Sequence, residues 1–302
     1  MLKLISLALL TLFSLFAEAQ INMLVKEGGF LFIEGKDSVC FYQKNQKVSE
    51  EGKYQRCNYI HPLYGLDNTR LTEDFPADHL HHRGIFWAWH QILIDNLQVS
   101  DGWELKSFSQ KVTDLEFRQL KGIGYLNTTV DWSSPLWESG EEPYLQEKTS
   151  ISMYPKNGNY RRIDFEIKLK ALTDRLRIGG SDDEKGYSGF SVRLKLPSDV
   201  GFSGENGSVE PVNTAVESGN FVKIDGSFLK SGKKGGVVMA SNPQNPPPSN
   251  SWIFRKAASM QNAAYPGRQP VAIPFDEPLV LKYSLLIFTG DMNMKQIKKA
   301  LK

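Results

Sequence analysis

Hydrophobic and polar residues alternate along much of the chain, with the period of two that is typical of β-strands. The clearest case is residues 160–171, where apolar side chains stand at 163, 165, 167 and 169 and charged ones between them. One face of this strand is therefore predicted to lie in a core and the other in water. Shorter runs of the same kind predict further strands at residues 29–34, 39–43, 144–154, 190–196, 236–240 and 279–288.

Turn-forming residues separate these runs. The pair Asn157-Gly158 favours a tight hairpin, so the two strands that flank it should pair antiparallel. The almost wholly apolar stretch 85–94 suits a strand buried on both faces or a crossing between sheets. One helix signal comes at the end, where Asp291 can cap residues 292–301, which should pack on a sheet edge or form a loose tail. This pattern predicts an all-β fold, a large antiparallel β-sandwich with a short C-terminal helix.

The first nineteen residues differ from the rest of the chain. Lys3 precedes an apolar run of about a dozen residues, and Ala17-Glu18-Ala19 provides a small-x-small cleavage site, the pattern of a secretory signal peptide. A membrane-spanning helix needs about 20 apolar residues, so no membrane span is expected after cleavage. We therefore predict an exported protein, periplasmic or extracellular, in which residues 20–302 form a single β-sandwich domain.

Charge and cysteine content narrow the possible partners. The formal net charge is +2, which argues against a nucleic-acid partner, because such a protein needs a concentrated basic face. Cys40 and Cys57 are the only cysteines. In an oxidising compartment they can form a disulfide, and two buried thiols are the alternative. A cysteine-based zinc site is not expected from two cysteines.

Chemistry is concentrated in one segment, because all five histidines fall between residues 61 and 90. Three of them stand in the run Asp78-His79-Leu80-His81-His82-Arg83-Gly84, and histidine changes charge near neutral pH. If this segment is extended, His79 and His81 point to one side and His82 to the other. Two imidazoles on one side can act as acid and base or ligate a divalent ion. Asp78 would then orient a ring and Arg83 would bind a carboxylate or oxyanion.

Other residues complete the candidate site. Glu147 begins a predicted strand and is the expected partner base. Trp132 and Trp137 stand in a polar, loop-like stretch, where their indoles either stack on sugar rings or pack conventionally. The two outlying histidines, His61 and His90, are interpreted as packing residues.

Several motifs resemble a known family. They are His61-Pro-Leu-Tyr64, Leu71-Thr-x-Asp-Phe-Pro76, the histidine run continued to Trp89, Lys185-Gly-Tyr-Ser-Gly-Phe-Ser-Val-Arg193, Asn242-Pro-x-x-Pro246 and Tyr265-Pro-Gly267. Together they resemble the bacterial secreted family labelled "methane oxygenase PmoA-like", a domain of unknown function, with Leu80 where that family usually carries proline. The resemblance implies a fold similar to galactose-mutarotase-type β-sandwiches and, by analogy, carbohydrate chemistry. Tyr187, within one of these motifs, joins the candidate substrate-binding residues.

The sequence therefore favours an exported enzyme that acts on a sugar or oligosaccharide as a lyase, epimerase or hydrolase. His79 with His81 or His82 would donate and accept the proton, and Glu147 would be the partner base. This mechanism requires no cofactor. Two alternatives stay open: a non-catalytic sugar-binding protein that uses the tryptophans, and a divalent-metal enzyme with His79 and His81 as ligands.

Overall fold

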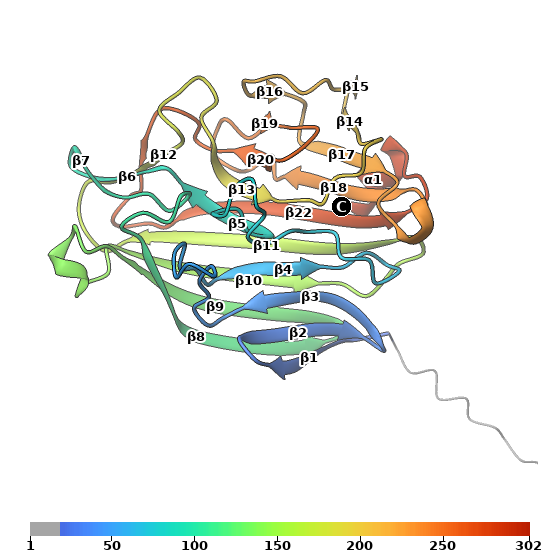
Figure 1. Cartoon of the computed structure of the whole chain (residues 1–302), viewed down its shortest axis with the longest axis horizontal. Coiled ribbons are helices and arrows are strands. Elements are labelled where there is room, and N and C mark those ends of the chain that lie inside the picture. Colours follow the sequence, from blue (N-terminus) through green and yellow to red (C-terminus); the bar gives the residue numbers. More distant parts are fainter. Residues whose placement is uncertain (1–18) are drawn as a thin grey trace, which may run out of the picture.

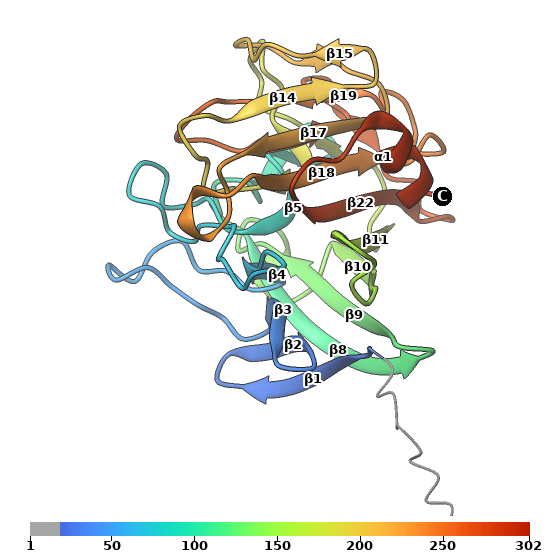
Figure 2. The same ribbon diagram turned by 90° about the vertical axis from the view of Figure 1, so that its right-hand side faces the viewer.

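Two large antiparallel sheets make up most of the chain, and the computed structural model describes residues 19–302. The predicted signal peptide, residues 1–19, lies outside the described residues apart from Ala19. Figures 1 and 2 show the two sheets as packed layers, with the short helix α1 (Met294–Ala300) on the outer side of one of them. The predicted all-β sandwich with a short C-terminal helix is confirmed.

The strands fall into three sheets. The first sheet has the order β1 (Ile21–Lys26), β2 (Gly29–Glu34), β3 (Asp37–Gln43), β4 (Tyr59–Leu63), β5 (Ile85–Trp89), β13 (Ser188–Val192), β20 (Gln261–Ala264), β19 (Ser251–Ile253) and β16 (Val216–Glu217). The second has the order β15 (Gly207–Ser208), β14 (Gly201–Gly204), β17 (Phe221–Gly226), β18 (Gly235–Ser241), β22 (Leu279–Thr289), β11 (Tyr160–Ala171), β10 (Leu145–Met153), β9 (Ile123–Ser133) and β8 (Ser109–Leu120). The third comprises β21 (Val271–Ala272), β12 (Leu176–Gly179), β6 (Gln91–Ile94) and β7 (Leu97–Ser100).

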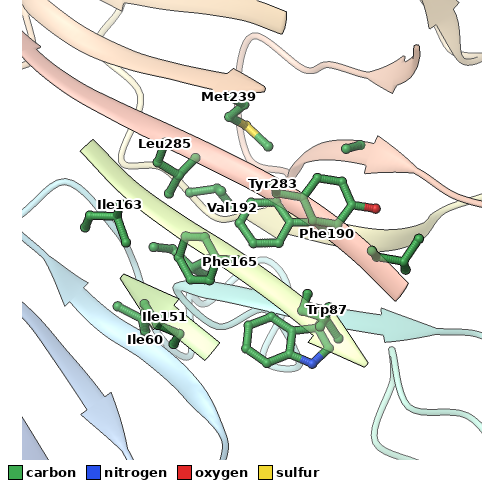
Figure 3. Close-up of a cluster of buried hydrophobic side chains, with 14 of the residues drawn as sticks. Ile60, Trp87, Ile151, Ile163, Phe165, Phe190, Val192, Met239, Tyr283 and Leu285 are labelled. Atoms are coloured by element: carbon green, nitrogen blue, oxygen red, sulfur yellow. The ribbon is translucent and has the colours of Figure 1, made fainter. Parts of the chain in front are cut away.

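The main core lies between the first two sheets. Figure 3 shows Trp87 and Phe190 of the first sheet beside Phe165 and Tyr283 of the second. The rings of Phe190 and Tyr283 stack with centroids 4.6 Å apart, and those of Trp87 and Phe165 meet edge to face at 6.3 Å. Because side chains alternate along a strand, β5 turns Trp87 inward and leaves its neighbours on the outer face of the first sheet.

Strand prediction succeeded where the alternation was strong. The predicted strand 160–171 is β11, and it pairs with β10 across the Asn157-Gly158 turn, with Met153 opposite Ile163. The apolar stretch 85–94 divides between β5 of the first sheet and β6 of the third, so the crossing between sheets is the correct alternative.

Two expectations need correction, and one open alternative, the state of the cysteines, is decided. The loop-like stretch that holds Trp132 is the end of β9, which forms a long hairpin with β8. The C-terminal helix is capped by Asn293 rather than Asp291. The side-chain oxygen of Asn293 accepts from the backbone N–H of Gln296, and the Gln296 side chain accepts from the backbone N–H of Asn293. The cysteines are both buried free thiols. The two thiols have different neighbours: Cys40 Sγ lies 3.7 Å from Met153 Sδ, and Cys57 Sγ lies 3.4 Å from Gln46 Nε2.

Helix α1 buries Ile297 against the outer face of the second sheet, beside Val238 and Leu286. It therefore packs on the sheet rather than forming a loose tail. None of the helices among residues 19–302 has the length and hydrophobicity that a membrane crossing requires.

Candidate active site

A pocket of about 730 Å³ lies over the outer face of the first sheet. That volume is in the range of small-molecule sites, about 300–1,000 Å³. A small hydrophobic cluster lies beneath it, in which Phe86 and Ala88 are side chains that β5 turns away from the main core and Trp103 comes from a following loop. Four histidines line the pocket: His79, His81, His82 and His90.

The histidine segment forms a tight turn, so the expectation of an extended segment is wrong. The backbone N–H of His79 donates to Pro76 O at 3.0 Å, and that of His82 donates to His79 O at 2.9 Å. All three rings therefore gather on one side, with centroids 4.6 Å apart for His79 and His82, 4.5 Å for His81 and His82, and 5.7 Å for His79 and His81.

Gly84 makes the sharp exit from this turn possible. Its φ is +23°, and a Cβ placed there would lie 1.9 Å from Ile60 O of the neighbouring strand. Only glycine permits so close an approach between two backbones. The turn is thereby pressed directly against β4.

His79 is oriented by a carboxylate. Its Nδ1 lies 2.7 Å from Asp78 Oδ2, and Arg193 Nη2 donates to the other carboxylate oxygen at 2.8 Å. Partial burial raises the pKa of Asp78, but the hydrogen bonds from His79 and Arg193 outweigh it and bring that pKa to about 2. An ionised carboxylate only accepts hydrogen bonds, so Nδ1 of His79 carries a proton, and Nε2 has a free lone pair whenever the ring is neutral.

His82 has the opposite proton arrangement. Arg193 Nη1 lies 3.0 Å from its Nδ1, and a guanidinium can only donate. Nδ1 therefore accepts, and the neutral ring carries its proton on Nε2. Burial, then the charges of His81 and Arg193, lower the pKa of His82 to about 2. His82 is a neutral N–H donor stacked beside a ring that offers a lone pair.

His90 forms a second carboxylate–imidazole pair. Its Nδ1 lies 2.9 Å from Asp101 Oδ2, and its ring stacks on Trp103 with centroids 5.4 Å apart. His90 was interpreted as a packing residue, but it both packs on Trp103 and lines the pocket. His61 does not line the pocket; its Nδ1 is 3.0 Å from Thr72 Oγ1.

His81 also lines the pocket, and its ring lies beside that of Tyr54 at 6.4 Å. Burial lowers the pKa of His81 to about 4, and the charge of Arg83 adds to this. The ring is therefore neutral at neutral pH. Tyr187, from the predicted substrate-binding set, lines the same pocket and lies 5.4 Å from Trp103.

Arg83 does not offer its charge to the pocket, in contrast to the prediction. It is buried, and its guanidinium donates to the carbonyls of Gly102 at 3.1 Å and Trp103 at 3.4 Å. It also lies 4.0 Å from the Phe86 ring centroid. Arg83 is thus a positioning residue that ties the histidine turn to the loop that carries Asp101.

Glu147 lies in the main core and not in the pocket. It is fully buried on β10, in phase with the inward-facing Leu145 and Ile151. Its carboxylate accepts from Asn58 Nδ2 at 2.9 Å and from Trp132 Nε1 at 3.1 Å. Burial raises the pKa of Glu147. The expected placement in a cleft is wrong because the period of two that predicts the strand also turns this residue inward.

The two predicted stacking tryptophans also lie outside the pocket. Trp132 is fully buried and packs edge to face on Phe108, with centroids 5.1 Å apart. Trp137 is half-buried and packs against the main core. Neither indole therefore presents a free face to a ligand in the histidine pocket.

A metal ion would need converging ligands. Asp78, His79 and His82 place one ligand atom each within 4.8 Å of the others. However, the rings of His79 and His82 lie within 10° of parallel, so their in-plane lone pairs do not point at a common centre. Arg193 also requires the proton of His82 to be on Nε2. The arrangement therefore fits an ion poorly and fits proton transfer well.

Fold and pocket together define an all-β sandwich protein with a histidine-lined site on the outer face of one sheet. The chain belongs to the family described as "Family of unknown function (DUF6807)", whose model matches residues 33–302. That range includes the whole histidine turn, His90 and Arg193. The family description carries no methane-oxygenase label. No curated protein matches the chain.

Proposed function

We propose that this protein is an exported enzyme that acts on a sugar or oligosaccharide by acid–base chemistry in the histidine pocket. The observation that carries the proposal is the opposite proton placement in two adjacent rings. Arg193 holds Asp78, which orients His79 as a base, and the same guanidinium fixes His82 as a donor. Such a pair presents a proton acceptor beside a hydrogen-bond donor.

The roles follow from the proton positions. His79 would accept a proton from the substrate at Nε2, and Asp78 would stabilise the imidazolium that results. His82 would donate a hydrogen bond to the substrate oxygen on which negative charge develops, as a neutral imidazole does. A base beside an oxyanion donor suits abstraction of a proton next to a carbonyl. Epimerase or lyase chemistry on a sugar that carries an aldehyde or ketone group therefore fits better than hydrolysis.

The carbohydrate part of the proposal has separate support. The pocket wall carries many hydrogen-bonding side chains, among them Gln91, Gln98, Asn213 and Ser259. The motifs that resemble the PmoA-like family imply a fold similar to galactose-mutarotase-type sandwiches, which is support by analogy. The apparent signal peptide supports an exported protein, and mass spectrometry of the periplasmic or secreted chain should find Gln20 at its N-terminus.

The test uses three matched histidine variants, His79→Gln, His82→Gln and His61→Gln, assayed on a panel of mono- and oligosaccharides with products detected by NMR. The two pocket variants should lose at least about 100-fold in turnover, the usual contribution of a positioned acid or base. The His61 variant should retain activity, because that ring lies outside the pocket. Circular dichroism checks that all three fold. Full activity in both pocket variants would refute the proposal.

The metal alternative is separated by elemental analysis of protein purified without a histidine tag. Acid–base catalysis by the imidazoles predicts a substoichiometric metal content and activity that survives a chelator. A stoichiometric ion whose removal abolishes turnover would replace the proposal.

A further inference from the structure

The charge of the pocket wall indicates what kind of ligand it takes. Four carboxylates line the pocket, namely those of Asp101, Glu104, Asp182 and Asp183. Two cationic side chains line it, Lys185 and Arg255. The lining residues therefore have a formal charge of −2, four negative charges less two positive ones, and Glu104 and Asp182 also pair with Lys106 and Arg268, which do not line the pocket.

Both cations already have partners. Arg255 Nη1 donates to the carbonyls of Val212 and Phe254, each at 2.7 Å, and Nη2 donates to Asn213 O at 3.0 Å. Its guanidinium also lies 5.4 Å from the Tyr187 ring centroid. Lys185 Nζ lies 3.9 Å from Asp183 Oδ2. Arg255 is therefore committed to backbone carbonyls, and Lys185 stands beside a carboxylate of the same wall.

The wall is also rich in acceptors. Beside the carboxylate oxygens, His79 and His90 each place Nδ1 on a carboxylate, so Nε2 is an acceptor whenever the ring is neutral. A carboxylate ligand has only acceptor oxygens and would meet repulsion, whereas each hydroxyl of a sugar can donate a hydrogen bond. An ammonium group donates three.

We infer that the pocket takes a neutral or amino-substituted sugar unit and rejects uronic acids. This inference rests on the proposed function and assigns its substrate class. Arg83, the cation that the sequence suggested for an acidic group, is committed to backbone carbonyls beneath the pocket.

The test is calorimetric titration of the mature chain with matched sugars at pH 7: galacto-oligosaccharides against oligogalacturonides, and deacetylated chito-oligosaccharides. Neutral or amino sugars should bind, and uronates should bind at least tenfold more weakly at 50 mM salt. At 500 mM salt the discrimination should shrink, because the screening length falls well below its value of about 8 Å at physiological salt.

A charge-reversed pair of variants sharpens the test. Glu104→Lys should raise uronate affinity several-fold, because it places a cation on the wall. Glu116→Lys, on β8 and away from the pocket, is the matched control and should not. Uronates that bind as tightly as neutral sugars, in a manner lost in His79→Gln, would overturn this inference and leave the proposed function intact. Failure of every sugar to bind would overturn the proposed function and this inference with it.

Discussion

Replacing Arg193 tests the arrangement beneath the pocket most directly. This side chain is 3% exposed and makes three charge-assisted or polar contacts, with Glu73 at 2.8 Å, Asp78 at 2.8 Å and His82 at 3.0 Å. Arg193→Met keeps much of the apolar stem and removes all three. Arg193→Lys keeps the charge but loses the planar fork that reaches three partners at once.

The cost can be estimated from these contacts. A hydrogen bond to a charged group contributes about 1.5–3 kcal/mol, and breaking a buried ion pair costs about 3–5 kcal/mol. Because the side chains of Glu73 and Asp78 are each 34% exposed, water replaces part of the loss. We expect about 3 kcal/mol for Arg193→Met and about 2 kcal/mol for Arg193→Lys. Urea unfolding followed by circular dichroism at pH 7 measures both.

The pH dependence gives a second readout. The folded pKa of Asp78 is about 2, below the ordinary value of about 3.9. Its stabilising contribution is therefore present above pH 4 and is lost as the pH falls toward 2. In the Met variant the pKa of Asp78 should rise, so the difference in unfolding free energy between the two proteins should narrow over that window.

The control is Arg118→Met. Arg118 is 71% exposed and pairs with Glu116 on the surface of β8, so its loss should leave the free energy of unfolding nearly unchanged. Nitrogen-15 NMR of the imidazoles should place the proton of His82 on Nε2 in the wild type and no longer exclusively there in Arg193→Met. The reasoning is refuted if Arg193→Met costs no more than Arg118→Met and leaves the His82 proton unmoved.

Three further predictions concern stability and the buried groups. Acidification from pH 7 to 5 should destabilise the fold, by up to about 4 kcal/mol per pH unit near pH 5. Burial lowers the pKa values of three histidines in the folded state, so these residues bind more protons when the chain is unfolded: His61, His81 and His82. Protonation of Glu147, whose pKa is raised, opposes this trend. Urea unfolding at several pH values measures the net effect, and an unfolding free energy that stays constant or rises on acidification would contradict the prediction. Burial raises the pKa of both cysteine thiols to about 12, so an aromatic disulfide reagent should titrate no thiol in the native protein and two in denaturant; none in denaturant would reveal a disulfide. Trp132→Ala should lower the free energy of unfolding by about 3–5 kcal/mol and leave sugar affinity unchanged. A variant that keeps its stability and loses sugar affinity would show that Trp132 binds the sugar.

The strands could be predicted where one face is polar and the other apolar. Residues 160–171 show this alternation most clearly and form β11 as predicted. The β8–β9 hairpin was missed, because β8 is largely exposed and its residues alternate weakly. Glu147 shows that the pattern carries more than was taken from it, since a carboxylate in phase with Leu145 and Ile151 must face inward.

The site could be located from sequence but its geometry could not. The histidine run predicts the pocket because three imidazoles beside Asp78 are unfavourable to bury in a hydrophobic core. Their mutual arrangement depends on Arg193, which lies 111 residues beyond His82 in the chain and reaches the turn only through the pairing of β13 with β5. The pairing of His90 with Asp101 likewise depends on how β5 leaves the first sheet.

Three buried arginines contact the histidine turn. Arg56 donates to the carbonyl of Leu80 at 2.6 Å, and Arg83 and Arg193 hold the rest of the turn. All three are buried beneath the rings. After the larger effect of burial, the charge of Arg83 lowers the pKa of His81, and the charges of His81 and Arg193 lower the pKa of His82.

The same cations therefore have two effects that a substrate-binding arginine could not combine. Arg56 and Arg83 donate to the carbonyls of Leu80 and His81, which helps to fix the turn, and Arg193 contacts the His82 ring itself. They also keep neighbouring imidazoles neutral at a pH where free histidine is partly protonated. The proposed mechanism needs a lone pair on His79 and an N–H on His82, and therefore neutral rings. Positive charge that lies behind the rings, away from the ligand, favours the neutral form and leaves the pocket wall acidic.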